Sequence, residues 1–153
     1  MMNFEFEYSF EPATDQQLDA FETEYGLTLS KDYKEFLKIN NGGKPVLRRF
    51  ETLDKVIISS IMFFFPLSEG VEANLEYFFK EYNLSSIVPS NFLPIGRDPM
   101  DSLICLVVTG EDQGKVYFCD LDYLEEDKVL KPEFIRLIAF SFVEFLNSLY
   151  KTE

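Results

Sequence analysis

The chain has 153 residues, of which 46% are hydrophobic, and its aromatic side chains include 17 Phe and 8 Tyr. This length and composition predict one folded domain with an aromatic core, and they exclude an intrinsically disordered chain. Asp and Glu total 27 against 14 Lys and Arg, so the formal net charge is −13. This charge argues against direct binding to nucleic acid or anionic lipid and favours a basic partner.

The N-terminal part of the chain predicts a strand followed by a helix. Residues 3–10 alternate between aromatic and polar positions, which is typical of a half-buried strand. The aromatic side is Phe4, Phe6, Tyr8 and Phe10, and the polar side is Glu5, Glu7 and Ser9. Thr14 and Gln17 have the spacing of a capping box, so a helix is expected to begin there. Its buried face is predicted to carry Leu18, Phe21 and Tyr25.

A second helix is predicted within residues 27–43. Ser30 is a suitable N-cap residue, and the helical spacing after it defines a buried face made of Tyr33, Phe36, Leu37 and Asn40. Gly42 or Gly43 is expected to supply the left-handed residue that ends this helix.

Two strands are predicted over residues 46–50 and 56–65, and the second is so continuously apolar that both of its faces should be covered. Phe63, Phe64 and Phe65 cannot all point inward from a strand, so one ring either packs beneath a helix or anchors a partner. A third helix is expected to end near residue 83. Its buried face carries Val71, Leu75, Phe78, Phe79 and Tyr82.

A hairpin with strands at residues 102–109 and 115–119 is expected next. Cys105 and Cys119 lie on its two arms, and a register that pairs them directly would bring their sulfur atoms into contact. They form either two reduced thiols or a disulfide, and a cytosolic setting favours the thiols.

The C-terminal part predicts a strand at residues 134–138 and a last helix. The apolar face of this helix is Phe142, Phe145, Leu146 and Leu149. The whole chain, residues 1–153, is therefore predicted to be a single α+β domain, in which about four helices pack on a mainly antiparallel sheet.

Four segments, in this order, resemble a known family. Residues 27–43, after a helix that closes on Glu24-Tyr25-Gly26, resemble the opening signature of the SUKH superfamily. Residues 93–98 resemble its central turn, residues 102–117 its hairpin and residues 138–146 its closing helix. This superfamily groups bacterial immunity proteins with a fungal regulator of cell-wall glucan synthesis.

The resemblance implies a SUKH-like α+β fold and two functions. The first is a non-enzymatic immunity protein that binds and neutralises a cognate bacterial toxin. Many such toxins are nucleases with basic substrate-binding surfaces, to which an acidic inhibitor is complementary. The alternative is a regulatory or scaffold protein linked to cell-wall polysaccharide synthesis.

The sequence offers no candidate catalytic residue, metal ligand set or cofactor. It contains no histidine, which removes the commonest general base and the commonest metal ligand. It also lacks the glycine-rich phosphate loop and the dinucleotide fingerprint. We therefore expect no enzymatic activity.

Acidic side chains gather between residues 98 and 127, where Lys115 is the only Lys or Arg. They form one negative patch if their loops share an edge of the sheet, and the charge is dispersed if the loops point to different sides. The candidate partner-binding residues are Asp98, Asp101, Glu111, Asp112, Asp120, Asp122, Glu125 and Glu126. Among these, Asp120 and Asp122 are predicted to be buried by the partner, and Glu111 and Asp112 to lie at the rim.

The location of the protein can also be predicted. No basic region followed by an apolar stretch is visible at the N-terminus, and the apolar run at residues 56–67 is shorter than the ~20 residues of a membrane helix. We expect a soluble, cytoplasmic protein without membrane contact.

Overall fold

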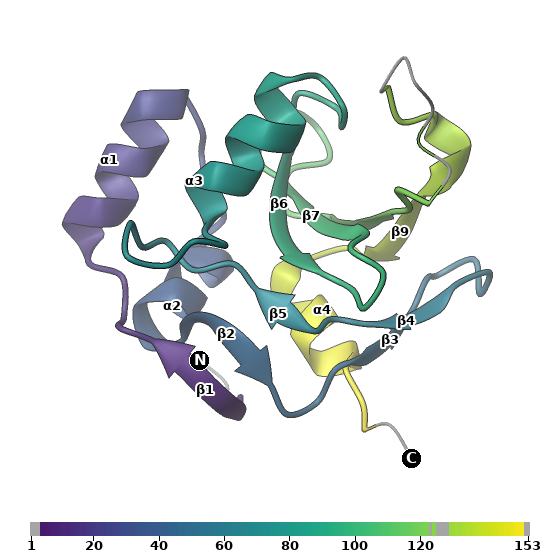
Figure 1. Ribbon diagram of the computed structural model, residues 1–153, viewed down its shortest axis with the longest axis horizontal. Coiled ribbons are helices and arrows are strands. Elements are labelled where there is room, and N and C mark those ends of the chain that lie inside the picture. The colour runs from purple at the N-terminus through teal and green to yellow at the C-terminus, as the bar shows by residue number, and fades with distance from the viewer. Residues whose placement is uncertain (1–3, 123, 125–128, 152–153) are drawn as a thin grey trace.

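Seven strands form one antiparallel sheet, in the order β1-β2-β5-β6-β7-β8-β9 (Figure 1). The computed structural model describes residues 4–122, 124 and 129–151. The strands of this sheet are β1 (Phe6–Phe10), β2 (Asn41–Pro45), β5 (Phe63–Phe64), β6 (Phe92–Arg97), β7 (Leu103–Val107), β8 (Val116–Cys119) and β9 (Ile135–Ala139). Between β2 and β5, the chain forms a separate two-stranded sheet from β3 (Arg49–Glu51) and β4 (Ile58–Ser60).

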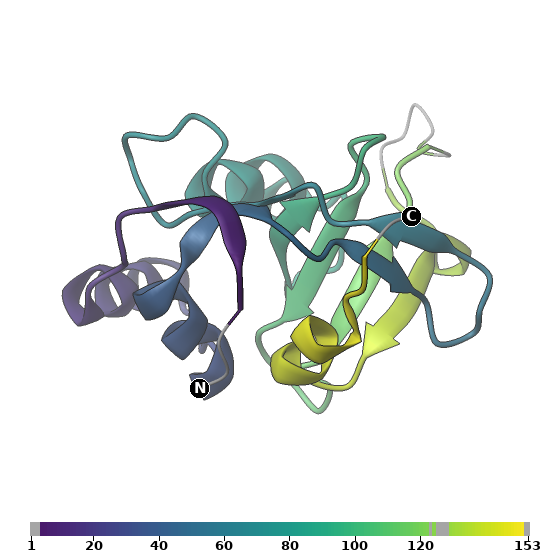
Figure 2. The ribbon, with the colours of Figure 1, turned by 90° about the horizontal axis from the view of Figure 1, so that it is seen from below.

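Helices pack around the main sheet. Within the described residues they are α1 (Asp15–Tyr25), α2 (Lys31–Ile39), α3 (Leu75–Phe78) and α4 (Phe142–Ser148), with a π-helical turn at Phe79–Leu84 and a 3₁₀ turn at Pro132–Phe134. Figure 2 shows α2 and α4 on one side of the sheet and α3 on the other. This arrangement confirms the predicted α+β class.

The core is built from aromatic rings on both faces of the sheet. On one face, Phe64 of β5 contacts Phe36 of α2 and Phe142 of α4 at centroid distances of 5.1 and 6.3 Å. On the other face, Phe65 stacks on Phe78 of α3 at 3.8 Å with nearly parallel rings. Both Phe64 and Phe65 are buried, so packing in the core explains these two members of the aromatic run.

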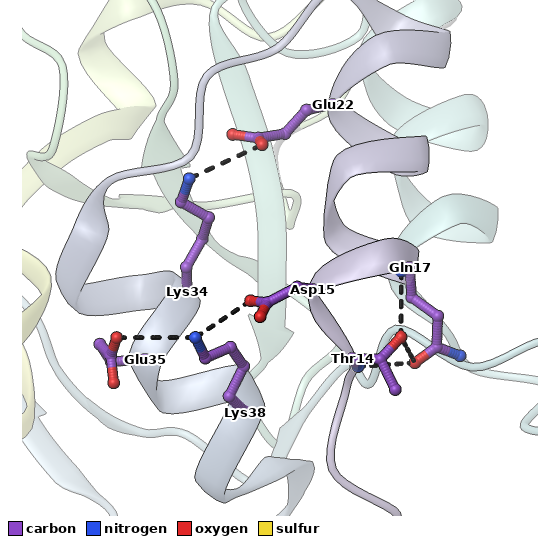
Figure 3. A network of polar contacts seen from close by, with 7 residues as sticks. All are labelled: Thr14, Asp15, Gln17, Glu22, Lys34, Glu35 and Lys38. Carbon is purple, nitrogen blue, oxygen red and sulfur yellow. Dashed lines mark hydrogen bonds and ion pairs between the residues drawn. The ribbon is translucent and has the colours of Figure 1, made fainter.

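The predicted capping box starts α1. The hydroxyl oxygen of Thr14 accepts the backbone N–H of Gln17 at 3.1 Å, and the Gln17 amide oxygen accepts the Thr14 N–H at 2.9 Å (Figure 3). The helix ends at Gly26, whose φ of 63° is left-handed. Leu18 and Phe21 are buried, as predicted, and Tyr25 is half-buried.

The predicted ends of α2 need correction. Ser30 occupies the N-cap position, but its side chain makes no capping bond to the helix. Its hydroxyl instead donates to the Asp32 carboxylate at 2.6 Å. The other oxygen of Asp32 accepts the Val143 N–H at 3.1 Å, which ties α2 to the first turn of α4. At its other end the helix stops at Ile39, before the two glycines that were expected to end it.

Gly42 and Gly43 belong to β2, so the helix-stop interpretation is wrong. Both have left-handed φ values, 72° and 114°. A Cβ atom at Gly43 would lie 2.2 Å from the carbonyl oxygen of Tyr8, and one at Gly42 would lie 2.6 Å from that of Phe64. The glycines are therefore required for the close approach of β1 and β5 to β2.

The predicted strand at residues 56–65 is broken in two. Its first half forms β4 of the small sheet and its last residues form β5 of the main sheet. Val56 and Ile58 are 57% and 54% exposed, so the expectation of two covered faces is wrong for the first half. The strand predicted at 46–50 begins later, at Arg49.

The alternation predicted for the first strand is interrupted by two irregularities in the pairing of β1 with β2. Phe6 contacts Phe64 in the core, whereas Tyr8 and Phe10 contact Phe63. Tyr8 is 50% exposed. The four aromatic residues therefore do not share one buried side, because a bulge rotates the residues that follow it.

The predicted hairpin of β7 and β8 is present, in a register that does not pair the two cysteines directly. Leu103 lies opposite Cys119, and Cys105 lies opposite Tyr117. The two sulfur atoms are nevertheless 3.8 Å apart, as buried free thiols. Burial, together with the neighbouring Cys119 thiol, raises the pKa of Cys105 well above its usual value.

Both thiols are expected to be unreactive in the folded protein, because burial excludes reagents and disfavours the thiolate that reacts. An aromatic disulfide reagent should label neither Cys105 nor Cys119 under native conditions and both after unfolding in guanidinium. Rapid labelling of the native protein would contradict the described packing of β7 and β8.

Candidate partner-binding surface

The candidate acidic residues divide between the two ends of β7. Asp98 and Asp101 lie in the β6–β7 turn, and Asp120 and Asp122 follow β8 at the same end of the sheet. Glu111 and Asp112 lie in the β7–β8 turn, which joins the opposite end of β7 (Figure 2). The described residues therefore form two acidic groups. Glu125 and Glu126, with Asp127, lie outside the described residues.

Asp98 holds the β6–β7 turn together from inside. Its side chain is buried, and one carboxylate oxygen accepts the N–H groups of Met100 and Ser102 at 2.9 and 2.8 Å. The other oxygen accepts the Ser59 hydroxyl at 2.9 Å and so connects the turn to β4. Asp98 thus shapes the turn from within the protein. Asp101, in the same turn, is exposed and has a left-handed φ of 65°.

Asp120 and Asp122 stand close to this turn. The Asp120 carboxylate accepts the Asp122 N–H at 3.1 Å, and the N–H of Leu121 donates to the Ser102 hydroxyl at 2.9 Å. The pKa of Asp122 is raised, by partial loss of hydration and by the negative charges of Asp120 and Asp98. A cation brought by a partner would relieve this repulsion, because an opposite charge stabilises a carboxylate.

An aromatic hollow adjoins this acidic group on the side of α3. It is lined by Tyr77, Phe78, Glu81, Tyr82, Arg97 and Asp101. Tyr77 is 51% exposed, and the rings of Phe78 and Tyr82 are stacked, with 6° between their planes. Aromatic rings that are partly exposed beside charges are common anchors in protein interfaces.

Sequence reasoning missed the part of this hollow that comes from α3. Phe78 and Tyr82 were assigned to the core, but both are only half-buried. Phe63, the third member of the aromatic run, is also half-buried and lies under the Arg97 guanidinium at 5.5 Å. An available signal was the adjacent Tyr77, which lies outside the apolar helical stripe and so had to face solvent.

The acidic group at the other end of the sheet is partly neutralised. The Asp112 carboxylate forms an ion pair with Lys115 at 2.7 Å. Lys115 also lies 5.7 Å from the ring of Phe140, which is 55% exposed. Glu111 and Asp112 are exposed. Their turn therefore presents less uncompensated charge than the β6–β7 end.

Within the described part of the chain, no group of three or more Cys, Asp or Glu side chains could hold a metal ion. None of the described helices is both long and apolar enough to cross a bilayer.

The fold is an α+β domain in which helices pack on a mainly antiparallel sheet. A family model described as the SMI1 / KNR4 family (SUKH-1) matches residues 12–148. The chain belongs to this family, and so to the SUKH superfamily that its sequence resembles. Comparison with curated proteins gave no match.

Proposed function

We propose that the protein is a non-enzymatic immunity protein that binds a basic toxin, such as a nuclease, and occludes its working surface. The observation that carries this proposal is the group of Asp101, Asp120 and Asp122 beside the aromatic hollow of Tyr77 and Tyr82. Family membership supports a role of this kind, and the net charge of −13 favours a basic partner.

The geometry suits association better than catalysis. Asp98, the buried carboxylate of this region, is fully engaged by N–H and hydroxyl donors of the protein itself. Asp101 and Asp122 are exposed and face solvent at the edge of the sheet. Exposed carboxylates steer a basic partner during approach, and the neighbouring rings then supply apolar contact area.

Association of the partner is expected to slow as salt rises. Mobile ions screen charges beyond ~10 Å at 0.1 M ionic strength and beyond ~3 Å at 1 M, so electrostatic attraction is lost over this range. Surface-plasmon measurements with the protein encoded by the neighbouring gene should show an association rate that falls about tenfold or more. Immunity genes normally adjoin their toxin genes, which makes this protein the first partner to test.

The variant Asp101→Asn with Asp122→Asn should lower the association rate at low salt more than it changes dissociation. A matched control is Glu5→Gln with Glu144→Gln, which removes the same charge from exposed positions away from this end of the sheet. A tight complex whose association rate changes neither with salt nor in the Asp101→Asn, Asp122→Asn variant would contradict a binding surface at this end of the sheet.

A further inference from the structure

A second concave surface lies between α1 and the segment that leads from β5 into α3. The hollow has a volume of about 250 Å³. Its lining has an apolar part, Ala20, Phe21 and Leu67, which we call the floor, and an acidic part, Glu24, Glu69 and Glu76. An adjoining hollow, which shares Gln17, Leu67 and Ser68, extends it toward Glu11. We call the two together the α1 groove.

The two sides of α1 differ in how their charges are compensated. On the side that faces α2, Asp15 pairs with Lys38 at 3.0 Å and Glu22 pairs with Lys34 at 3.7 Å (Figure 3). Glu22 also accepts the Leu29 N–H at 2.8 Å. The acidic side chains on this side are therefore occupied within the protein.

The side of α1 that faces the groove has no such compensation. No Lys or Arg lines either hollow. Among the described residues, none forms an ion pair with Glu11, Glu24, Glu69 or Glu76. The negative charge of the groove thus faces solvent above an apolar floor.

Hydrogen bonds fix the lining of the groove before any partner binds. The buried amide of Asn41 donates to the carbonyl oxygens of Glu11 and Leu67, at 2.9 and 3.0 Å, and so joins the start of the groove near Glu11 to the segment that contains Leu67. The Leu75 N–H donates to the Pro66 carbonyl oxygen at 2.9 Å, so the two ends of the segment between β5 and α3 are held together. A preformed site loses less conformational entropy on binding.

Tyr25 positions one of the carboxylates. Its hydroxyl donates to Glu76 at 2.5 Å, across the space between α1 and α3. The pKa of Tyr25 is raised, first by burial and then by its hydrogen bonds to Glu76 and Glu24. The phenol therefore stays protonated and continues to donate to Glu76 at neutral pH.

We propose that the α1 groove binds a Lys- or Arg-bearing segment of the basic partner protein, an inference that rests on the proposed function. The charged head of such a side chain would lie among Glu24, Glu69 and Glu76, and its aliphatic stem would lie on Phe21 and Leu67. The groove matches both halves of this side chain: an apolar floor for the stem and uncompensated carboxylates for the head. Acidic or purely apolar segments would leave these carboxylates without a partner.

The test uses a short capped peptide of alternating Lys, Arg and Leu, titrated into the ¹⁵N-labelled protein at about 0.1 M salt. Amide shifts are expected to concentrate in residues 17–24 and 66–76. The triple variant Glu24→Gln, Glu69→Gln, Glu76→Gln should weaken binding about tenfold, because three exposed charge pairs are lost while the acceptor for Tyr25 is kept.

The matched control is the triple variant Glu5→Gln, Glu51→Gln, Glu144→Gln, which changes net charge equally at exposed positions away from the groove. It should weaken binding less than threefold. Equal weakening by both triple variants, or shifts centred elsewhere, would overturn the assignment to the groove.

The same two triple variants, assayed against the neighbouring gene product, separate this inference from the proposed function. Unchanged toxin binding by the groove variant would overturn the groove as a binding site and leave the immunity function standing. Absence of any complex with the unmodified protein would count against the immunity function instead.

Discussion

Asn41→Leu is expected to lower the free energy of unfolding by about 3 kcal/mol or more. Asn41 is 1% exposed, and its side chain makes three hydrogen bonds to backbone groups. It donates to the carbonyl oxygens of Glu11 and Leu67 and accepts the Leu67 N–H at 2.9 Å. Leucine has a similar volume but no polar atoms, so these groups would lose their partners while buried, at about 1–3 kcal/mol each.

Urea unfolding followed by circular dichroism measures this effect. Asn147→Leu is the matched control, because Asn147 is exposed on α4, and a surface change of this kind should stay within about 0.5 kcal/mol. Equal stability of the two variants would show that water readily replaces the Asn41 amide. It would also remove the main reason to regard the α1 groove as preformed.

The helices were the part of the fold that local sequence could predict. The start of α1 depends on Thr14 and Gln17, which are three positions apart. The buried face of α4 is defined by Phe142, Phe145 and Leu146, which lie three and four positions apart. Interactions of this range are encoded in neighbouring residues. The start of α1 and the buried face of α4 were therefore predicted correctly.

The errors arose where a distant segment decides the conformation. Gly43 must lack a side chain because β1 passes so close that a Cβ atom would lie 2.2 Å from the carbonyl oxygen of Tyr8. The strand predicted at residues 56–65 divides because successive backbone N–H groups turn to different segments. The N–H of Ile61 donates to the carbonyl oxygen of Arg48 at 2.8 Å, and the N–H of Met62 donates to that of Arg97 at 2.9 Å. Neither partner can be identified from a local pattern.

The candidate surface shows a similar division. Consecutive antiparallel strands place successive turns at alternate ends of a sheet, so the separation of Asp98 from Glu111 was implicit in the predicted hairpin. The α1 groove could not be predicted in this way. Its acidic residues Glu11, Glu24, Glu69 and Glu76 come from two stretches of the chain, 11–24 and 69–76, that only the folded chain brings together.

Phe145→Ala is expected to lower the free energy of unfolding by about 3–5 kcal/mol, the usual cost of removing a buried phenylalanine ring. Phe145 has no exposed surface, and its ring contacts those of Phe50, Phe64 and Phe142 at centroid distances of 6.0 to 6.3 Å. The ring therefore joins α4 to both sheets, and alanine would leave a cavity that these fixed neighbours cannot fill.

Thermal and urea unfolding test this result against a variant with the same chemical change, Phe140→Ala. Phe140 lies close in sequence but is 55% exposed, so its loss should cost only a fraction of that effect, about 1 kcal/mol or less. An unchanged stability of Phe145→Ala would mean that α4 does not present this residue to the sheet. A total stability of about 5–15 kcal/mol is typical of such a domain, so Phe145→Ala should also increase the unfolded fraction at physiological temperature. Partner binding by Phe145→Ala should therefore be measured well below the melting temperature of this variant, where its acidic surface is still folded. Under that condition, loss of stability can be told apart from loss of recognition.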